Sequence, residues 1–492
     1  MNPFHHPPNL SGFMSRREML RQVGLGFGGW ALLDLLARDC SGAGQSALPA
    51  NPLASRAPHF PAKAKNVIFL FMQGGPSHID TFDPKPLLAK LDGQPLPPSA
   101  TAGLQLQFTK LDAAIHGCKQ TFKRCGESGL EIADNYPHLQ SCADDLAVVR
   151  SCFHDSFNHA PAQYVMNTGF SRMGHPCLGS WVTYGLGSVS ENLPAFVVMT
   201  NTGSVKGGPP VYGRGFLPGT YQPTVLRNSG SPMLYLERPE QLAHANQREM
   251  LDFVQWLNRN HQAARGADTD DLSARISSYE LAFRMQAAVP DAVDLGKESQ
   301  ATKDLYGVDD KISGTYARNC LIARRLIERG VRFVQIFTGG GGADDWDAAH
   351  ADNDRVHEQM ARRTDRPTAA LLKDLKARGL LESTLVIWGG EFGRTPITDG
   401  RYPEKPAGRD HNPYGFTTWL AGGGIKGGKT IGATDDFGLR AVDNPVHIHD
   451  LHATILKLLG LDHTKLTFLF QGRQQRLTDV GGDEEFAARL TS

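Results

Sequence analysis

The chain has 492 residues, and its 51 Lys and Arg balance 51 Asp and Glu, so it carries no formal net charge at pH 7. This balance does not favour a nucleic acid or an acidic membrane surface as a partner. Hydrophobic residues make up 40% of the chain, which supports a sizeable core. The length allows one large domain or two to three smaller ones.

The first 55 residues are predicted to be a twin-arginine export signal and linker. Ser15–Arg21 holds two adjacent arginines and an apolar residue two positions later, as such signals do. Val23–Leu36 is mildly apolar but too short and too interrupted to span a bilayer. A chance arginine pair in an amphipathic helix is the alternative. The prediction implies export through the twin-arginine translocase, a periplasmic or extracellular location, and a domain at residues 56–492 without an integral membrane segment.

Six cysteines follow this leader: Cys118, Cys125, Cys142, Cys152, Cys177 and Cys320. An oxidising compartment permits disulfides, and Cys118 with Cys125 or Cys142 with Cys152 are close enough in sequence to pair. Buried free thiols are the alternative. Because the chain has no Cys-x-x-Cys pair, a zinc cage built from thiolates is not expected.

The first half of the chain is predicted to alternate strands and helices. Short apolar runs between loops are typical of buried strands, and the runs of this kind are Lys65–Met72, Leu146–Val149 and Ala195–Thr200. Pro84–Gly126 is rich in proline and glycine and is expected to cross the surface. Helices are expected at Asn135–Asp145 and Asn158–Gly169, the latter with Asn158 as N-cap and Gly169 as C-cap.

The second half continues this alternation after a Gly- and Pro-rich loop at Lys206–Gly230. Pro239–Gly330 favours helix almost throughout, with breaks near Gly266 and Gly296. The expected strands are Val331–Phe337, Thr384–Trp388 and Thr417–Leu420. Apolar spacing predicts helices at Tyr316–Arg329, Asp352–Arg378 and His449–Leu459. The alternation predicts an α/β fold, a three-layer sandwich with a mostly parallel central sheet flanked by helices.

Four of the strands lead into loops crowded with Asp, Glu and His. Ligands of open α/β sheets bind beyond the carboxyl ends of the strands, so these side chains are expected to gather along one edge of the sheet. In chain order the loops hold His78 and Asp80, then His154, Asp155 and His159, then Asp344, Asp345, Asp347 and His350, then Glu391 and Arg394. The pattern predicts a metal-assisted active site.

Asp347 and His350 are the strongest candidate metal ligands. They lie three residues apart, and in a helical segment both side chains would share one face. A single cation is then within reach of both. Each residue taken alone is more often an ordinary surface residue, so the hypothesis rests on the pair and on its Gly-rich context.

Glu391 follows two glycines at the end of a strand and is expected to be a metal ligand or a base. Arg394 offers a planar fork for an anionic oxygen. The alternative is that these two residues form an ion pair that braces the loop. His411 is a candidate third ligand, with Asp410 orienting it or balancing its charge.

The residues around these candidates resemble a known family, the sulfatase-like "domain of unknown function 1501" proteins. The similar runs are Gly74–Asp83 (GGPSHIDTFD), Trp346–His350 (WDAAH), Trp388–Pro396 (WGGEFGRTP), Gly408–Gly415 (GRDHNPYG) and Arg476–Val480 (RLTDV). The resemblance covers nearly the whole mature chain. It implies exported proteins with the fold of the alkaline-phosphatase/sulfatase superfamily, whose members use one or two metals and a nucleophile at a helix start.

The resemblance implies one intact metal site and one eroded site. Asp347, His350 and His411 match the first, although two residues separate Asp347 from His350 where three are usual. In the second site the first-strand Asp falls near Gln73, unless His78 or Asp80 replaces it. The Asp-His pair of that site falls on Glu391 and Phe392, which leaves one ligand.

His159 stands where the resemblance implies a nucleophilic Ser, Thr or modified Cys. At a helix start the unpaired amides favour an anion, so a sulfate or phosphate group is expected to dock there. The helix dipole opposes protonation of the imidazole, which is then available as nucleophile, metal ligand or base. A purely structural bond to a carboxylate such as Asp155 is the alternative.

Three classes of function follow from this reading. The first is a hydrolase of a sulfate or phosphate ester, small-molecule or glycan, that depends on a divalent ion such as zinc, manganese or calcium. The second is a degenerate member that binds an anionic glycan without turnover. The third is a structural or complex-forming exported protein. The first class assigns catalysis to His159, Glu391 and Arg394.

Overall fold

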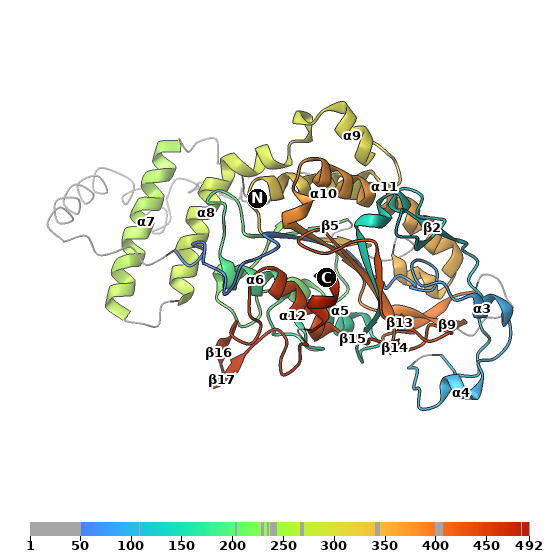
Figure 1. Ribbon diagram of the computed structural model, residues 1–492. Coiled ribbons are helices and arrows are strands. Elements are labelled where there is room, and N and C mark those ends of the chain that lie inside the picture. The colour runs from blue at the N-terminus through green and yellow to red at the C-terminus, as the bar shows by residue number, and fades with distance from the viewer. Residues whose placement is uncertain are drawn as a thin grey trace, which may run out of the picture. The chain divides into compact units, whose positions relative to one another are not determined.

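The apolar runs of the sequence become neighbouring strands of one nine-stranded sheet (Figure 1). The computed structural model describes residues 51–107, 109–201, 204–227, 231–233, 236, 244–265, 270–339, 345–398, 407–483 and 485–491. Residues from Pro52 onward belong to one unit. The predicted export signal lies outside the described residues except for its last positions, 51–55, and its boundary at residue 55 stays a prediction.

The strands of the sheet pair in the order β12-β4-β11-β8-β1-β7-β5-β6, with β15 added beside β4. Of the described strands, β11 runs antiparallel to both its neighbours, and the other pairings are parallel. The prediction of a mostly parallel sheet is therefore confirmed. The bounds are β1 Asn66–Met72, β4 Leu146–Phe153, β5 Phe196–Thr200, β6 Thr224–Leu226, β7 Phe333–Thr338, β8 Thr384–Gly389, β11 Phe416–Ala421, β12 Lys429–Ile431 and β15 Val446–His447.

Helices cover both faces of the sheet, because alternate residues of each central strand point to opposite faces. In β1, Ile68, Leu70 and Met72 pack into one core, and Val67, Phe69 and Phe71 pack into the other. The first core contains α8 (Asp270–Val293), α9 (Gln300–Tyr306), α10 (Gly314–Glu328) and α11 (Asn353–Ala377). The second contains α5 (His159–Thr168), α6 (Leu178–Leu186), α12 (Ile448–Leu458) and α13 (Glu485–Thr491). The three predicted layers are present.

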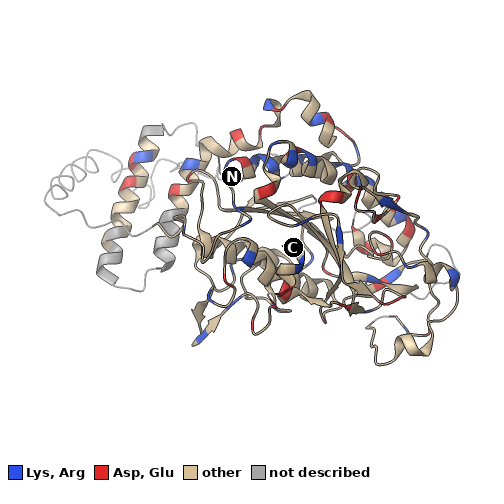
Figure 2. Cartoon of the chain, in the orientation of Figure 1, with Lys and Arg blue, Asp and Glu red and all other residues tan. Residues whose placement is uncertain are grey.

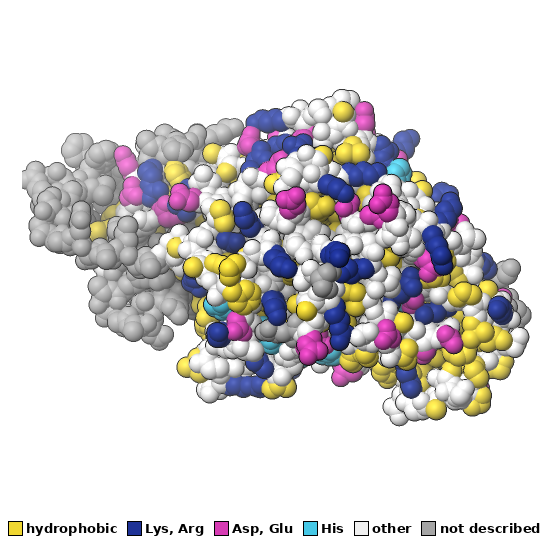
Figure 3. Space-filling view, viewed as in Figure 1, with side chains coloured by type: hydrophobic (Ala, Val, Ile, Leu, Met, Phe, Trp, Pro, Cys, Tyr) yellow, Lys and Arg dark blue, Asp and Glu magenta, His cyan; other side chains and the backbone are white. Residues whose placement is uncertain are grey.

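Smaller elements lie around this sandwich. α7 (His244–Arg265) packs against α8, and Figure 1 shows it away from the sheet. The excursion after β1 holds two short helices, α3 (Pro86–Lys90) and α4 (Pro98–Thr101), and Figure 3 shows apolar side chains gathered over them. The two-stranded ribbons are β2–β3 (Phe122–Cys125, Leu130–Ala133), β9–β10 (Gly393–Thr398, Arg409–Asn412), β13–β14 (Ala433–Thr434, Ala441–Asp443) and β16–β17 (Phe468–Phe470, Arg473–Gln475).

One local prediction was wrong, and of the two alternatives for the cysteines the structure shows free thiols. The helix expected at Asn135–Asp145 is a 3₁₀ helix limited to Leu139–Asp145, because Pro137 disfavours helical backbone at Tyr136. The suggested disulfides are absent, since all six described cysteines are free thiols and five of them are buried. The expected break near Gly266 lies outside the described residues.

The described surface agrees with the balanced composition. Figure 2 shows Lys and Arg interspersed with Asp and Glu along helices such as α10 and α11. Among the helices that the structure describes, none combines the length and apolar character that a bilayer crossing requires.

Candidate metal centre

The carboxyl ends of β1, β4, β7 and β8 meet at one edge of the sheet. Because β1 pairs in parallel with both β7 and β8, the loops that follow these strands emerge side by side. β4 points the same way, since both it and β8 run antiparallel to β11. Side chains from distant parts of the sequence therefore approach one another here, as predicted.

Asp347 and His350 lie on a single turn of 3₁₀ helix, Trp346–His350. Residues three apart eclipse one another in this helix, so Asp347 Oδ1 lies 3.4 Å from His350 Nε2. Asp345 caps the turn, because its carboxylate accepts a hydrogen bond from the backbone N–H of Asp347 at 3.2 Å. The local structure thus places both candidate ligands on one face.

His411 completes a triangle of donor atoms with this pair. Its Nε2 lies 2.8 Å from His350 Nε2 and 3.3 Å from Asp347 Oδ1. Four-coordinate zinc binds nitrogen and oxygen at about 2.0–2.2 Å, which separates neighbouring ligand atoms by about 3.4 Å. Two edges of the triangle are near this separation, and the edge between His350 and His411 is shorter at 2.8 Å. The donor set could hold a divalent metal ion once the two imidazoles move slightly apart.

His159 lies beside the triangle at the first position of α5, directly after the N-cap residue Asn158. Its Nε2 is 2.7 Å from Asp347 Oδ1, and its Nδ1 is 2.7 Å from Glu391 Oε1. Burial opposes a positive charge on this imidazole, but the two carboxylates outweigh burial and raise the pKa of His159. The two carboxylates therefore oppose the effect that the helix dipole is expected to have on the protonation of His159.

Glu391 contacts His159 and does not join the triangle. Its side chain is fully buried, and it accepts hydrogen bonds from the backbone N–H of Gly74 at 2.9 Å and from Gln163 Nε2 at 3.2 Å. Gly74 has a φ of +105°, and a Cβ there would lie 2.1 Å from Asp345 Oδ1, so the position requires glycine. Glu391 therefore orients the imidazole of His159.

The protonation of Asp347 and His411 suits metal binding. Burial would raise the pKa of Asp347, but His159, His411 and the charge of Arg394 outweigh it and hold that pKa well below its usual range. Burial, together with the charge of Arg394, lowers the pKa of His411 well below its ordinary value. An ionised carboxylate and a neutral imidazole are the forms that bind a metal.

Arg394 does not offer a free fork to an anion, contrary to the prediction. It is fully buried, and its guanidinium donates to the backbone carbonyls of Gly74, Gly75 and Arg409. It also donates to the carbonyl oxygen of Trp346 at 3.4 Å and contacts Asp347 Oδ1 at 3.3 Å. Because the guanidinium donors are directed at backbone oxygens, Arg394 fixes the loop after β1 and adds positive charge near Asp347.

Lys206 is the cation of the site that the sequence reasoning missed. Its Nζ lies 2.6 Å from Asp347 Oδ2, and its side chain is 23% exposed. It belongs to the loop after β5, another strand whose carboxyl end reaches this edge. The run Lys206-Gly207-Gly208 follows a predicted strand, but a lysine in a loop is by itself most often an ordinary surface residue.

His78 and Asp80 are held by other partners. Asp80 forms an ion pair with Arg409, whose Nε lies at 2.9 Å, and it accepts from Asn353 Nδ2 at 3.1 Å. His78 Nε2 bonds the carbonyl oxygen of Gly438 at 2.8 Å. Among the described residues, His159, Asp347 and His411 form one further group of potential ligands within reach of one ion, and His350, Asp410 and His411 form another. Neither His78 nor Asp80 belongs to them.

Asp410 supports His411 through the backbone rather than through the imidazole. Its Oδ1 accepts from the backbone N–H of His411 at 2.7 Å, and its Oδ2 accepts from Thr109 Oγ1 at 2.7 Å. Thr109 lies in the excursion that follows β1. This segment therefore helps to fix the loop that presents His411.

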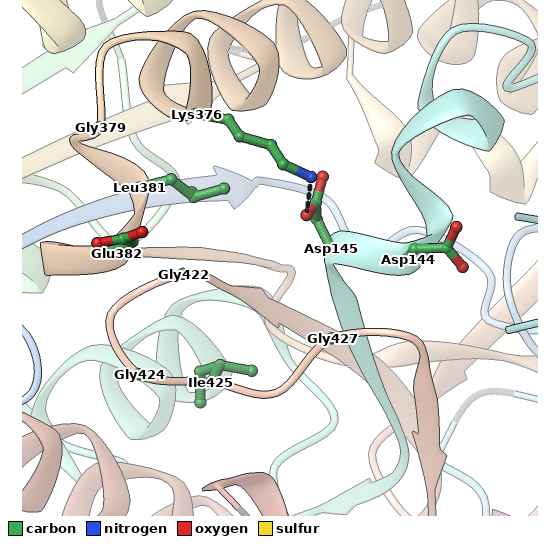
Figure 4. A pocket seen from close by; sticks show the side chains of 10 residues that line it. All are labelled: Asp144, Asp145, Lys376, Gly379, Leu381, Glu382, Gly422, Gly424, Ile425 and Gly427. Carbon is green, nitrogen blue, oxygen red and sulfur yellow. Dashed lines mark hydrogen bonds and ion pairs between the residues drawn. The ribbon is translucent and has the colours of Figure 1, made fainter. Parts of the chain in front are cut away.

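The opposite edge of the sheet holds a pocket of about 300 Å³ without any of these features (Figure 4). An ion pair between Lys376 and Asp145, 2.7 Å apart, lies in it. Its lining consists otherwise of Asp144, Glu382, Leu381, Ile425 and glycines. With no imidazole in the lining, this pocket offers no comparable donor set.

Comparison with known proteins identifies a family but no activity. The family described as "Protein of unknown function (DUF1501)" matches residues 64–486. No curated protein matches the chain.

Solved structures with a similar arrangement have low identity to the chain. The PsFucS1 sulfatase from Pseudoalteromonas sp. is 11% identical with a TM-score of 0.37, covering 85% of this chain and 72% of that one. The alkaline phosphatase from the Antarctic bacterium TAB5 is 12% identical with a TM-score of 0.32, covering 81% and 98%. The lipoteichoic acid synthase LtaP from Listeria monocytogenes is 10% identical with a TM-score of 0.33, covering 89% and 79%.

Proposed function

The chain belongs to the DUF1501 family, and we propose that this member is a hydrolase of sulfate or phosphate esters that depends on one divalent metal ion. The observation that carries the proposal is the triangle of Asp347 Oδ1, His350 Nε2 and His411 Nε2, with edges of 2.8, 3.3 and 3.4 Å. Beside it lie an imidazole held by a carboxylate and a partly exposed ammonium. Such a set suits an ester whose leaving group and oxyanion both need charge stabilisation.

Asp347, His350 and His411 would hold the metal. One carboxylate and two imidazoles accept zinc or manganese readily and calcium less readily. When bound, the ion supplies Lewis-acid polarisation of the ester. α5 begins at His159, beside Asp347, and its first turn would direct backbone N–H groups toward an anionic substrate.

His159 would act as the general base. In this structure its Nδ1 faces Glu391 and its Nε2 faces Asp347. With Asp347 bound to a metal ion, the tautomer with the proton on Nδ1 would leave Nε2 to take a proton from an attacking water. Glu391 would stabilise the imidazolium that results, as the carboxylate of a catalytic triad does. Gly74 and Gln163 keep Glu391 in place.

A second candidate is an anion-binding member without turnover. It is favoured by the residue at the start of α5, which is His159 and not the Ser, Thr or Cys implied by the family resemblance. In that case the same residues would bind a metal and a sulfated or phosphorylated glycan. The third class, a structural exported protein, would need no metal.

One set of measurements tests these proposals. We expect purified protein to contain one equivalent of metal by mass spectrometry and a His350→Ala variant to contain much less. We expect the wild type to cleave an aryl sulfate or aryl phosphate, and His159→Ala to keep its metal but lose turnover by about 10²- to 10⁴-fold. Metal without turnover in the wild type would favour the binding protein. Absence of metal would contradict both.

We also propose that residues 1–55 direct export by the twin-arginine translocase, which carries folded proteins, and that residues 56–492 form the hydrolase domain. The support is the arginine pair in Ser15–Arg21. Replacement of Arg16 and Arg17 by lysine is expected to keep the uncleaved protein in the cytoplasm, detected by fractionation. Unchanged export of this variant would contradict the proposal.

A further inference from the structure

The ammonium of Lys206 lies among groups of the kind that bind metal ions. Besides Asp347 Oδ2 at 2.6 Å, its Nζ has Asp345 Oδ2 at 3.5 Å and His159 Nε2 at 3.4 Å. Two carboxylates and an imidazole around one point would serve a divalent cation. Here the chain itself supplies the positive charge at that point.

The two carboxylate oxygens of Asp347 contact different groups. Oδ1 faces His159, His350 and His411, whereas Oδ2 faces Lys206. In sites with two metals a clamp of two cations about 3.5–4 Å apart stabilises both the attacking and the leaving oxygen. Asp347 links the metal position to an ammonium in a comparable way.

The loop fixes the position of Lys206. Its backbone N–H donates to Gln73 Oε1 at 3.0 Å. The next residue, Gly207, donates to Gln163 Oε1 at 2.9 Å and accepts from the hydroxyl of Tyr164 at 2.6 Å. A Cβ on Gly207 would lie 2.4 Å from Val211, so this close approach requires glycine. The ammonium is therefore placed before any ligand arrives, which is the condition for electrostatic preorganisation.

We propose that Lys206 is a built-in second cation of this centre, so that the protein takes one metal ion and binds the substrate oxyanion between that ion and the ammonium. This inference rests on the proposed function. A second dication near Asp345 and Asp347 would have to displace Lys206. The side chain is 23% exposed, so an oxyanion can reach its Nζ from solvent.

The test uses Lys206→Met and Lys206→Gln, which remove the charge, and Lys206→Arg, which keeps it. Lys376→Met is the matched control, because it removes a lysine that pairs with a carboxylate at 2.7 Å on the opposite edge of the sheet (Figure 4). Metal equivalents are counted after zinc loading and desalting. Inorganic phosphate binding is measured by calorimetry on metal-free and zinc-loaded protein, and circular dichroism verifies folding.

We expect one zinc equivalent in the wild type and in the control. Lys206→Met and Lys206→Gln should lower phosphate affinity by at least about 10-fold, the loss expected for one charge-assisted hydrogen bond, and Lys206→Arg should retain most of it. Two zinc equivalents in the wild type, or wild-type phosphate affinity in both neutral variants, would overturn the inference. Failure of the proposed function gives a different result, namely no zinc or no ester turnover in the wild type.

Discussion

Asp80 and Asp347 both follow strands at the same edge of the sheet, yet their surroundings differ. Asp80 is buried and bonded to the guanidinium of Arg409 at 2.9 Å. Asp347 has a side chain that is 29% exposed, and imidazoles surround its Oδ1. Asp347 also contacts two cations, the guanidinium of Arg394 at 3.3 Å and the ammonium of Lys206 at 2.6 Å. It differs from Asp80 because solvent reaches it and because its neighbours include imidazoles that can share a metal ion with it. Solvent access and neighbouring imidazoles, rather than the position after a strand, therefore distinguish the two carboxylates.

The largest expected effect is on the stability of the protein and comes from the ion pair between Asp80 and Arg409. Arg409→Met should lower the free energy of unfolding by about 3–5 kcal/mol, because it leaves a buried carboxylate without its counter-charge. Denaturant titration measures this loss. The double variant Asp80→Asn with Arg409→Met should recover part of it. A loss below about 1 kcal/mol would mean that Arg409 is not what balances Asp80.

Asp347 should govern metal binding and not stability. Asp347→Asn is expected to lower zinc affinity by about 100-fold, the upper range seen for residues that tune metal sites, measured by competition with a chromophoric chelator. Asp80→Asn is the matched control and should leave zinc affinity unchanged. An equal loss of zinc affinity in the two variants would show that Asp347 and Asp80 do not differ in metal binding.

Glu391 is expected to affect catalysis more than metal affinity. Glu391→Gln keeps the size of the side chain but removes the charge that orients His159, so turnover of an aryl phosphate should fall by at least about 10-fold. Zinc stoichiometry should stay at one, since Glu391 lies outside the donor triangle. Loss of the metal in this variant would instead make Glu391 a ligand.

The smallest expected effect is a dependence of stability on pH that comes from His154, which braces the site. Its Nε2 bonds the carbonyl oxygen of Glu391 at 2.5 Å, and burial lowers the pKa of His154 to about 4. The folded pKa is below the unfolded value of about 6.5, so stability is complete above about pH 6.5 and falls as the pH drops toward 4. One proton contributes a slope of about 1.4 kcal/mol per pH unit.

Denaturant titrations between pH 4 and 7 check this slope. His154→Gln should flatten it by about one proton, because the amide does not titrate. His452, whose pKa burial lowers to about 3, remains in both proteins and contributes to the residual slope, as do His78 and His357, whose pKa values burial also lowers. An unchanged slope in the variant would show that His154 does not contribute.

The sequence was sufficient to predict the fold, because buried parallel strands leave continuous apolar runs and their order along one edge follows from chain topology. Spacing indicated that Asp347 and His350 share a face, and the family resemblance added His411. The structure places the donor atoms of these three residues within 3.4 Å of one another. The sequence also predicted the helix that begins at His159. These features depend on local pattern.

What could not be predicted depends on pairs of residues far apart in the chain. Asp80 and Arg409 are separated by 329 positions, and neither neighbourhood in the sequence indicates their ion pair. The burial of Arg394 could not be predicted for the same reason. Its acceptors are backbone carbonyls, and the residue types in the sequence do not indicate which carbonyls will face a given side chain. In the sequence Lys206 looks like any lysine in a surface loop, because only the fold brings its side chain to Asp347.

Gln163 restricts how this site can vary. It is fully buried on α5, donates from Nε2 to Glu391 and accepts at Oε1 from the N–H of Gly207. A primary amide supplies a donor and an acceptor on one planar group, so a carboxylate or an alkyl chain of equal length would leave one neighbour unsatisfied. Through this one amide the loop that carries Lys206 and the acid that orients His159 are mechanically joined, and a shift of either is transmitted to the other.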